Sequence, residues 1–215
     1  MYARPSDRVD DEQAALEMLE AAPLVHLVSS TTEVGFEVTS LPMIVDHEAG
    51  HLAGHVARAN TQWERLDGSR AVVIAVTSES YVSPSWYPSK QQNDGRVVPT
   101  WNYEAVHVHG VARVHADKAW LSDLVRTLTD RHETRRTDGS HRWAVSDAPI
   151  DFIDRQLDAI VGVSVSLERI EAKQKLNANR SAADRAGVVE GLSATDGAPQ
   201  RMIELMARSL DGEPR

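Results

Sequence analysis

The segment from Tyr81 to Gly110 carries the side chains best suited to bind a planar ligand. It holds five of the chain's eleven Phe, Tyr and Trp residues, namely Tyr81, Trp86, Tyr87, Trp101 and Tyr103. Pro, Ser, Thr and Asn residues stand between these rings, where they fix turns and offer hydroxyl or amide groups. Such a segment can hold a flat ligand by its faces and its edge. The sequence therefore predicts a binding site for a planar ligand of unknown type.

Two histidines at the end of this segment form a second candidate. His107 and His109 are two residues apart on an expected strand, so both side chains point to one face of a sheet. Two imidazoles there could ligate a metal or heme iron, bind a phosphate, or simply form hydrogen bonds on the sheet face. The sequence leaves these three interpretations open.

Two other segments combine cations with amide groups. In the segment 54–60 an expected strand runs into a helix start, where backbone N–H groups and Arg58 could hold a phosphate or carboxylate. The alternative is that Asn60 caps the helix and Arg58 forms a surface ion pair. The segment 173–180 is basic and rich in amides, and it could close over an anion from another subunit or serve as a solvated connector.

Several catalytic motifs can be set aside. The segment 47–51 matches the His-Glu-x-x-His zinc-protease pattern, but that chemistry needs both histidines on one face of a helix. Here the flanking residues predict a hairpin with Gly50 in its turn, so we expect no metal. The sequence holds no dinucleotide-binding glycine pattern, no phosphate-binding loop of the Walker type and no nucleophile elbow. No catalytic residue is therefore assigned, and whether the chain is an enzyme stays open.

Composition narrows the class of protein. The formal net charge of −9 argues against direct DNA binding, because that affinity comes from clustered Lys and Arg. No cysteine is present, which excludes disulfides and thiolate chemistry. No apolar run approaches the roughly 20 residues of a membrane span, and the first residues lack a signal sequence. We expect a cytoplasmic protein with no membrane partner.

The elements that must position these residues follow from hydrophobic periodicity and turn signals. Helices are expected over 10–21, 61–66, 119–128 and 149–157 and again from 181 onward, with a charged loop over 130–142. Strands are expected over 24–30, 36–45, 51–57, 71–77, 81–83, 106–115 and 161–167. This order predicts a mainly β fold with helices (α+β), a sheet or barrel built from hairpins. Met202, Leu205 and Met206 form an apolar stripe, for which packing is the simplest explanation.

Seven short blocks in this chain resemble the PaiB family of FMN-binding negative transcriptional regulators. They lie at residues 1–5, 54–60, 81–87, 98–103, 105–107, 159–162 and 179–180, in the family's order, and the Trp-Tyr and Thr-Trp-Asn-Tyr blocks are specific. The resemblance implies an FMN-binding split β-barrel over 1–175, with a helical C-terminal appendage over 176–215. It also implies a homodimer with cofactor clefts at the interface.

The resemblance turns the candidate segments into an expected FMN site. Trp86 and Trp101 would flank the ring, while Arg58, Ser83, Ser85 and Lys90 would contact the ribityl chain and phosphate. The full set of expected cofactor-facing residues is His55, Arg58, Asn60, Ser83, Ser85, Trp86, Tyr87, Lys90, Thr100, Trp101, Asn102, His107, His109, Lys175 and Arg180. The expected function is negative regulation, acting indirectly or through redox chemistry.

Two other functions are considered as alternatives to FMN-dependent negative regulation. The related piperazate synthases are similar in sequence and use heme to form a nitrogen–nitrogen bond in N-hydroxyornithine, so heme is the alternative cofactor. In that case His55, His107 or His109 would be the axial ligand. The chain departs from the family pattern at Ser40, at Thr61 and within 175–180, close to the cofactor-facing residues. A barrel without a cofactor that serves in assembly is the third possibility.

Overall fold

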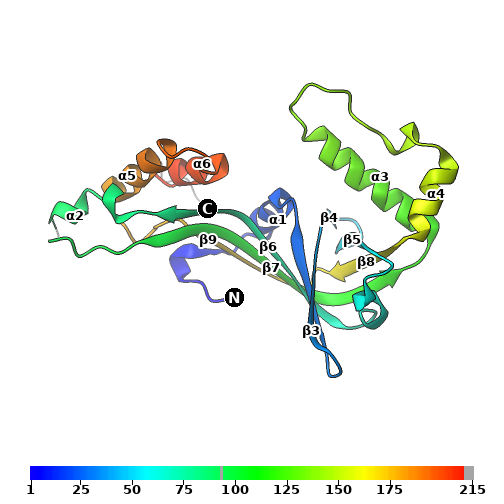
Figure 1. Ribbon diagram of the computed structural model, residues 1–215. Helices are drawn as coiled ribbons and strands as arrows, with labels where there is room; N and C mark the ends of the chain where they lie inside the picture. Colours follow the sequence, from blue (N-terminus) through cyan, green and yellow to red (C-terminus); the bar gives the residue numbers. More distant parts are fainter. Residues whose placement is uncertain (93, 211–215) are drawn as a thin grey trace. The chain divides into compact units, whose positions relative to one another are not determined.

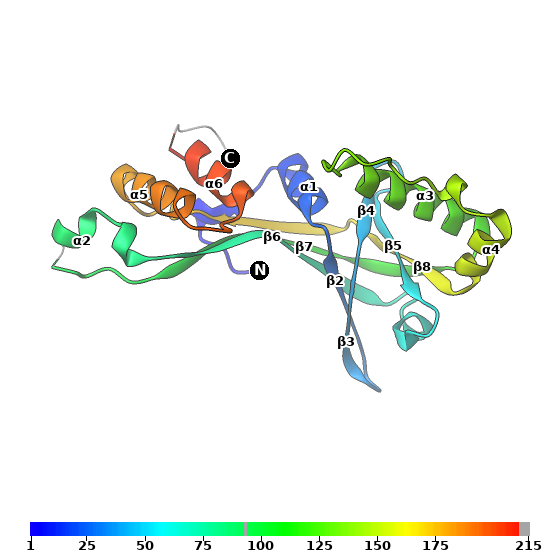
Figure 2. The same ribbon diagram turned by 45° about the horizontal axis from the view of Figure 1, so that its top comes forward.

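The computed structural model describes residues 1–92 and 94–210 (Figures 1 and 2). The chain divides into two compact units. The first contains Met1–Ala22, Ala75–His107 and the chain from Glu171 onward; the second contains Pro23–Ile74 and Val108–Ile170. Strands β6 (Arg70–Val82) and β7 (Thr100–His115) each contribute residues to both units, and each unit has a hydrophobic core of its own.

The strands form one antiparallel arrangement with the order β3-β2-β6-β7-β8-β5-β4, while β9 (Arg169–Lys175) pairs with β7 and with the short β1 (Arg8–Val9). With the helices described below, this confirms the mainly β fold with helices that the sequence predicts. The pairing of β9 is new, since the sequence indicates only a connector after residue 173. Within the part of the chain that the structure describes, none of the helices combines the length and apolar character needed to cross a bilayer.

The second unit contains most of the predicted hairpins. Its strands are β2 (Val25–Thr31), β3 (Gly35–Leu41), β4 (Met43–Asp46), β5 (His51–Ala57) and β8 (Ile160–Ser166). The expected strand 36–45 is broken into β3 and β4 at Pro42, because proline has no N–H to donate to a ladder. The β4–β5 hairpin pairs Asp46 with His51, and Gly50 in its turn has a φ of +66°. The hairpin interpretation of the zinc-like motif is therefore confirmed.

Helix α3 (Lys118–Thr134) covers one face of this unit's strands. Asp117 caps it by accepting a hydrogen bond from the Trp120 amide. Its apolar side chains pack with those of β4 and β5 in a small core of Ile44, Ala53, Leu124 and Leu128, with Trp120 at the edge. The helix runs past residue 128, so the expected loop 130–142 begins later than predicted. Helix α4 (Ile150–Asp158) then leads into β8.

The first unit contains the remaining parts of β6 and β7. Helix α1 (Glu12–Ala21) begins at the cap Asp11, which accepts from the Ala14 amide. Figures 1 and 2 show α5 (Ala182–Ser193) and α6 (Gln200–Arg208) side by side. Their apolar residues pack with residues of β6, of the turn after β6 and of the segment after β9 to form the core of this unit. The buried core residues are Val82, Tyr87, Leu176, Val188, Leu192, Met202, Leu205 and Met206. The apolar stripe on α6 is thus a packing surface, as expected.

Candidate functional site

One face of the first unit's sheet combines two lysines with exposed aromatic rings. Along β7 the side chains alternate, so that Asn102, Glu104 and Val106 are buried beneath the sheet. Trp101 and Tyr103 point to the opposite side, where Lys173 and Lys175 project from β9. We call this set, together with Thr100, the lysine–aromatic face.

The two lysines are held in place by oxygen atoms and rings. The Lys173 ammonium donates to the Tyr103 hydroxyl at 2.8 Å and to the Tyr2 carbonyl at 3.2 Å, and it lies 5.0 Å from the centre of the Tyr103 ring. The Lys175 ammonium donates to the Trp101 carbonyl at 2.7 Å and to the Thr100 hydroxyl. The Lys175 contacts use two of its three N–H donors, which leaves one for an anion, whereas Lys173 is only 7% exposed and is buried among its partners.

The aromatic part of this face is open. Trp101 is 53% exposed and Tyr81 is 46% exposed, and their rings meet edge to face with centres 6.0 Å apart. Exposed large rings beside fixed ammonium groups can stack on a planar ligand while the cations bind an attached phosphate. The geometry therefore suits the chemistry that the sequence predicts for Trp101, Thr100 and Lys175.

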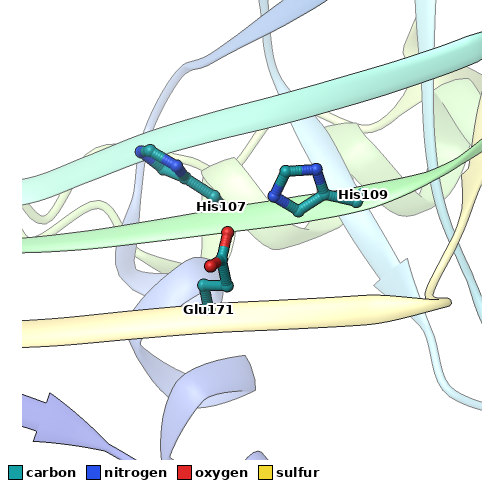
Figure 3. A group of neighbouring side chains, drawn as sticks. All are labelled: His107, His109 and Glu171. Carbon is teal, nitrogen blue, oxygen red and sulfur yellow. The ribbon is translucent and has the colours of Figure 1, made fainter. Parts of the chain in front are cut away.

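His107 and His109 lie on the same side of β7, as their spacing predicts, and Glu171 on β9 lies beside them (Figure 3). One ligand atom from each of the three residues lies within 4.8 Å of the others. All three side chains already take part in interactions, and Glu171 accepts a 2.6 Å ion pair from the N-terminal ammonium of Met1. The arrangement brings the two predicted histidines together and supplies a carboxylate that sequence analysis missed.

The predicted residues on the turn after β6 are placed differently. Ser83 caps the short helix η3 (Pro84–Trp86) and its hydroxyl lies 2.7 Å from that of Ser85. A cavity of about 560 Å³ is lined by residues of this turn, including Ser85, Trp86, Tyr87 and Lys90. One side of the Trp86 ring, however, is covered by α5, because a Cβ added at Gly191 would lie 2.3 Å from it.

Three further predicted residues serve packing in the first unit. Tyr87 is only 2% exposed; its hydroxyl accepts from Asn177, and the Arg180 guanidinium lies 4.6 Å from its ring centre. Burial is the main cause that raises the pKa of the Tyr87 hydroxyl above its ordinary value. Asn102 is fully buried and donates to the Met206 sulfur at 3.1 Å. These contacts tie β7 to α6 and the turn after β6 to the segment that precedes α5.

The segment 54–60 belongs to the second unit, and Arg58 and Asn60 there have structural partners. The Arg58 guanidinium donates to the carbonyls of Asp158 and Ile160, at 2.7 and 3.0 Å, where α4 ends. Asn60 caps η2 (Thr61–Arg65) by accepting from the Gln62 amide. Since η2 is a single short turn of 3-10 helix, the structure provides no extended helix N-terminus for a phosphate. Asn60 therefore acts as the cap that the sequence offered as an alternative, whereas Arg58 binds two backbone carbonyls and not the acidic partner of the expected surface ion pair.

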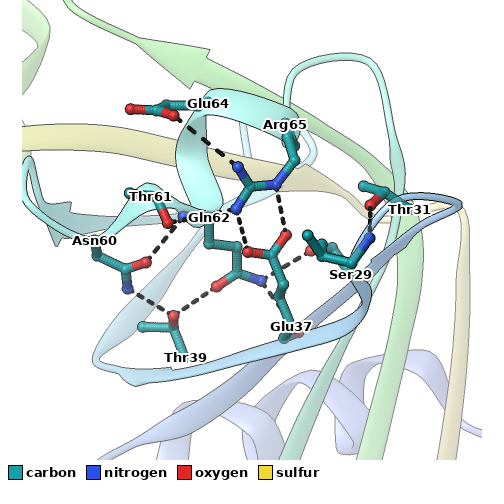
Figure 4. Close-up of polar contacts among 10 residues, drawn as sticks. Ser29, Thr31, Glu37, Thr39, Asn60, Thr61, Gln62, Glu64 and Arg65 are labelled. Atoms are coloured by element: carbon teal, nitrogen blue, oxygen red, sulfur yellow. Dashed lines mark hydrogen bonds and ion pairs between the residues drawn. The ribbon is translucent and has the colours of Figure 1, made fainter.

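A buried amide organises the polar cluster around this turn (Figure 4). Gln62 is 3% exposed; its amide nitrogen donates to the Ser29 hydroxyl, and its oxygen accepts from Thr39. Thr39 in turn accepts from the Asn60 side chain at 2.8 Å. The cluster satisfies polar groups that would otherwise be buried at a cost, and it fixes the turn after β5 to β2 and β3.

His55 stands out in the second unit because its Nδ1 is buried and has no hydrogen-bond partner among the described residues. Burial lowers the pKa of its imidazole below the ordinary value of 6.5. In the sheet register His55 and His115 flank Gly162 from either side, and the His115 ring stacks on Trp120 at 4.0 Å. His55 is therefore held as a neutral base near neutral pH.

Sequence reasoning missed Tyr103 and Lys173 as parts of the lysine–aromatic face. The signal was present, since Lys173 and Lys175 are two residues apart and alternate as on a strand. It was obscured because the segment carries charges and amides and looks like a connector.

The comparisons with known proteins agree with this architecture. Residues 1–169 match the model of the family described as "Putative FMN-binding domain". The protease synthase and sporulation protein PAI 2 of Bacillus subtilis is 31% identical over 84% of both chains. An uncharacterised protein of Aspergillus fumigatus is 34% identical over 68% of this chain, and the chain spans about two thirds of that relative.

Among solved structures, the FAD and heme binding protein of Mycobacterium smegmatis aligns with a TM-score of 0.57 at 13% identity, over 83% of this chain and 78% of that one. At this identity the likeness establishes the fold alone. The fold is the split β-barrel found in flavin-binding proteins, as the family resemblance implies.

Proposed function

We propose that this chain, which belongs to the PaiB family and matches the model described as "Putative FMN-binding domain", binds FMN at the lysine–aromatic face. The observation that carries the proposal is the position of the Lys175 ammonium, which is fixed beside the exposed Trp101. The indole offers a surface for the flavin ring, and the ammonium a partner for the phosphate. When bound, the flavin would supply the redox chemistry.

The donor set fits this group. FMN carries a dianionic phosphate and a polar ribityl chain, and the face offers the remaining N–H donor of Lys175 with the hydroxyls of Thr100 and Tyr103, while the buried Lys173 adds positive charge beneath them. The lysines stay ordered because carbonyl oxygens hold them, so binding would cost little side-chain entropy.

The test is a flavin titration of wild-type protein and three charge-matched variants. Lys175→Gln removes the proposed phosphate contact and should weaken FMN binding about 10-fold or more, because a hydrogen bond to a charged group contributes about 1.5–3 kcal/mol. Arg126→Gln removes an equal charge from an exposed pair with Asp123 in the second unit and should leave the affinity unchanged. Binding is measured by quenching of flavin fluorescence.

Lys90→Gln is the third variant, because Lys90 lines the cavity beside Trp86. If Lys90→Gln weakens FMN binding and Lys175→Gln does not, the cofactor lies at that cavity and the proposed location is wrong. If riboflavin binds as tightly as FMN, the proposed phosphate contact is wrong as well.

We further propose that the protein works as a homodimer with the cofactor at the interface, and that it regulates transcription indirectly. The exposed Phe36 (81%) and Val38 (61%) on the edge strand β3 support an association surface, and the net charge of −9 supports an indirect action. Light scattering that gives the mass of one chain would contradict the first proposal. A gel shift that persists at physiological salt would contradict the second.

Heme is the second candidate cofactor, and His55 is the observation that favours it. A half-buried imidazole with an unpartnered nitrogen and a pKa lowered by burial is neutral, which is the form that ligates heme iron. Heme reconstitution should then give a Soret band that His55→Ala abolishes, while His132→Ala, on the surface of α3, preserves it. A protein that stays colourless after reconstitution would exclude this candidate and with it an enzyme of the piperazate synthase type.

A further inference from the structure

The first unit contains a second cavity, which lies beneath the sheet between α1, α6 and β9. Its volume is about 310 Å³, within the range of small-molecule sites. Gln174 lines it, and this residue alternates with Lys173 and Lys175 along β9. The cavity therefore opens on the other face of the sheet from the lysine–aromatic face.

The wall of this cavity is both apolar and cationic. Met18 from α1 and Leu205 from α6 form apolar surface, while Arg201 and Arg208 bring two guanidinium groups to the same cavity. The two arginines are two turns apart on α6, with Leu205 between them, so they lie on one face of the helix. Glu17 is the acidic lining residue and it is exposed.

A buried carboxylate fixes one of these arginines. Glu104 has no exposed surface and accepts hydrogen bonds from Thr77, Gln174 and Arg201, the last at 2.5 and 3.2 Å. Arg201 uses Nε and one Nη2 hydrogen in this pair, which leaves its Nη1 hydrogens and the second Nη2 hydrogen. Its side chain remains 35% exposed. Arg201 is thus held rigidly with donors to spare, as a preorganised anion site requires.

Arg208 is available without such a constraint. It makes no ion pair or hydrogen bond with another described side chain, and the end of α6 that carries it is anchored by the Arg185 guanidinium, which donates to the Ser209 carbonyl at 2.8 Å. Ser209 also lines the cavity, and its hydroxyl donates to the Met206 carbonyl at 2.6 Å. Two guanidinium groups with unused N–H donors beside an apolar wall suit a ligand that is anionic at one end and apolar along its length.

We propose that this cavity binds a small aliphatic carboxylate. Its carboxylate group lies between Arg201 and Arg208, and its hydrocarbon chain lies against Met18 and Leu205. The site is separate from the flavin site and does not depend on it.

Hexanoate is the probe, titrated into the full-length protein by calorimetry, with hexanol as the uncharged control. Hexanoate should bind at one site per chain and hexanol should not. Arg208→Gln should weaken hexanoate binding about 10-fold or more, because it removes a charge-assisted hydrogen bond. Arg126→Gln should leave binding unchanged. No binding by the wild-type protein, or binding that Arg208→Gln leaves unaltered, would overturn the proposal.

A second variant tests the location without touching a charge. Ala14 lines the cavity from α1 and is half-buried, so Ala14→Met fills it with a flexible side chain that helix α1 tolerates. This variant should lose hexanoate binding and keep flavin binding. Equal hexanoate affinity in Ala14→Met and wild type would place the ligand elsewhere and overturn the proposal.

The same assay separates simple acids from amino acids. 6-Aminohexanoate carries an ammonium group that can reach the rim carboxylate of Glu17. Tighter binding of this compound that Glu17→Gln abolishes would identify an amino acid as the ligand type, and equal binding of both compounds would identify a simple acid. Both results support the carboxylate site, whereas failure of hexanoate to bind refutes it whether or not 6-aminohexanoate binds.

Discussion

The two partners of the Glu104–Arg201 ion pair differ in burial, so we expect that removing one of them destabilises the protein more than removing the other. The Glu104 side chain has no exposed surface, whereas Arg201 is 35% exposed. If Arg201→Met removes the cation, the carboxylate is left without its charge partner and cannot reach water. If Glu104→Gln removes the anion, Arg201 can turn its guanidinium to solvent. The first substitution should therefore cost more stability than the second.

The magnitudes follow from the contacts. Breaking a buried ion pair by removing one partner costs about 3–5 kcal/mol, and Arg201→Met should fall in this range. Glu104→Gln keeps the side-chain shape but replaces one accepting oxygen with an NH₂ group. Because each carboxylate oxygen accepts a hydrogen bond from Arg201, that NH₂ group then faces an Arg201 N–H donor. Because Arg201 can then be solvated, we expect a cost of about 1–3 kcal/mol, the range for one unsatisfied buried group.

Urea unfolding at pH 7 measures both substitutions and the double variant Glu104→Gln/Arg201→Met. The double variant should be more stable than the sum of the single losses predicts, because it leaves no uncompensated charge. A larger loss for Glu104→Gln than for Arg201→Met, or strictly additive losses, would refute the reasoning that burial of the carboxylate controls this network.

Three further substitutions test other parts of the structure. Burial lowers the pKa of the folded His55 imidazole below its ordinary value of 6.5, so the unfolded chain binds more protons and the unfolding free energy falls as the pH drops below about 6.5. His55→Gln should make the unfolding free energy depend less on pH, which the urea midpoints at pH 7.5 and 5.5 measure. Gly191→Ala should cost about 1–3 kcal/mol despite alanine's better helix propensity, because its Cβ would meet the Trp86 ring; a rise in thermal midpoint would contradict this packing. Asn102→Leu should change the unfolding free energy by less than about 1 kcal/mol and leave flavin affinity unaltered, because the Asn102 oxygen is buried without a partner among the described residues.

The sequence predicted the strands of the second unit because their periodicity and turns are local. β5 begins and ends where expected, and the Asp117 cap of α3 is also a local signal. β9 was not predicted, since its pairing with β7 depends on residues about seventy positions away. Two lysines at 173 and 175 indicate a strand only when the strand with which they pair is known.

The candidate site was predictable in its residue types but not in its geometry. Trp86 and Trp101 look equivalent in sequence, yet α5 covers part of the Trp86 ring while Trp101 remains open. This difference arises from the glycines at 187 and 191, which permit close approach of α5. In the same way, Asn102 and Tyr103 are neighbours in the chain, but the alternation of a strand buries the first and exposes the second to the lysines.

The central claim is that Lys175 and Trp101 hold a flavin phosphate and ring on the lysine–aromatic face. Titration of FMN into wild-type and Lys175→Gln protein, followed by flavin fluorescence, tests it most directly. We predict saturable binding of one FMN per chain that Lys175→Gln weakens about 10-fold or more and that Arg126→Gln leaves intact. Absence of FMN binding to the wild-type protein, or equal affinity in wild type and Lys175→Gln, would contradict the claim.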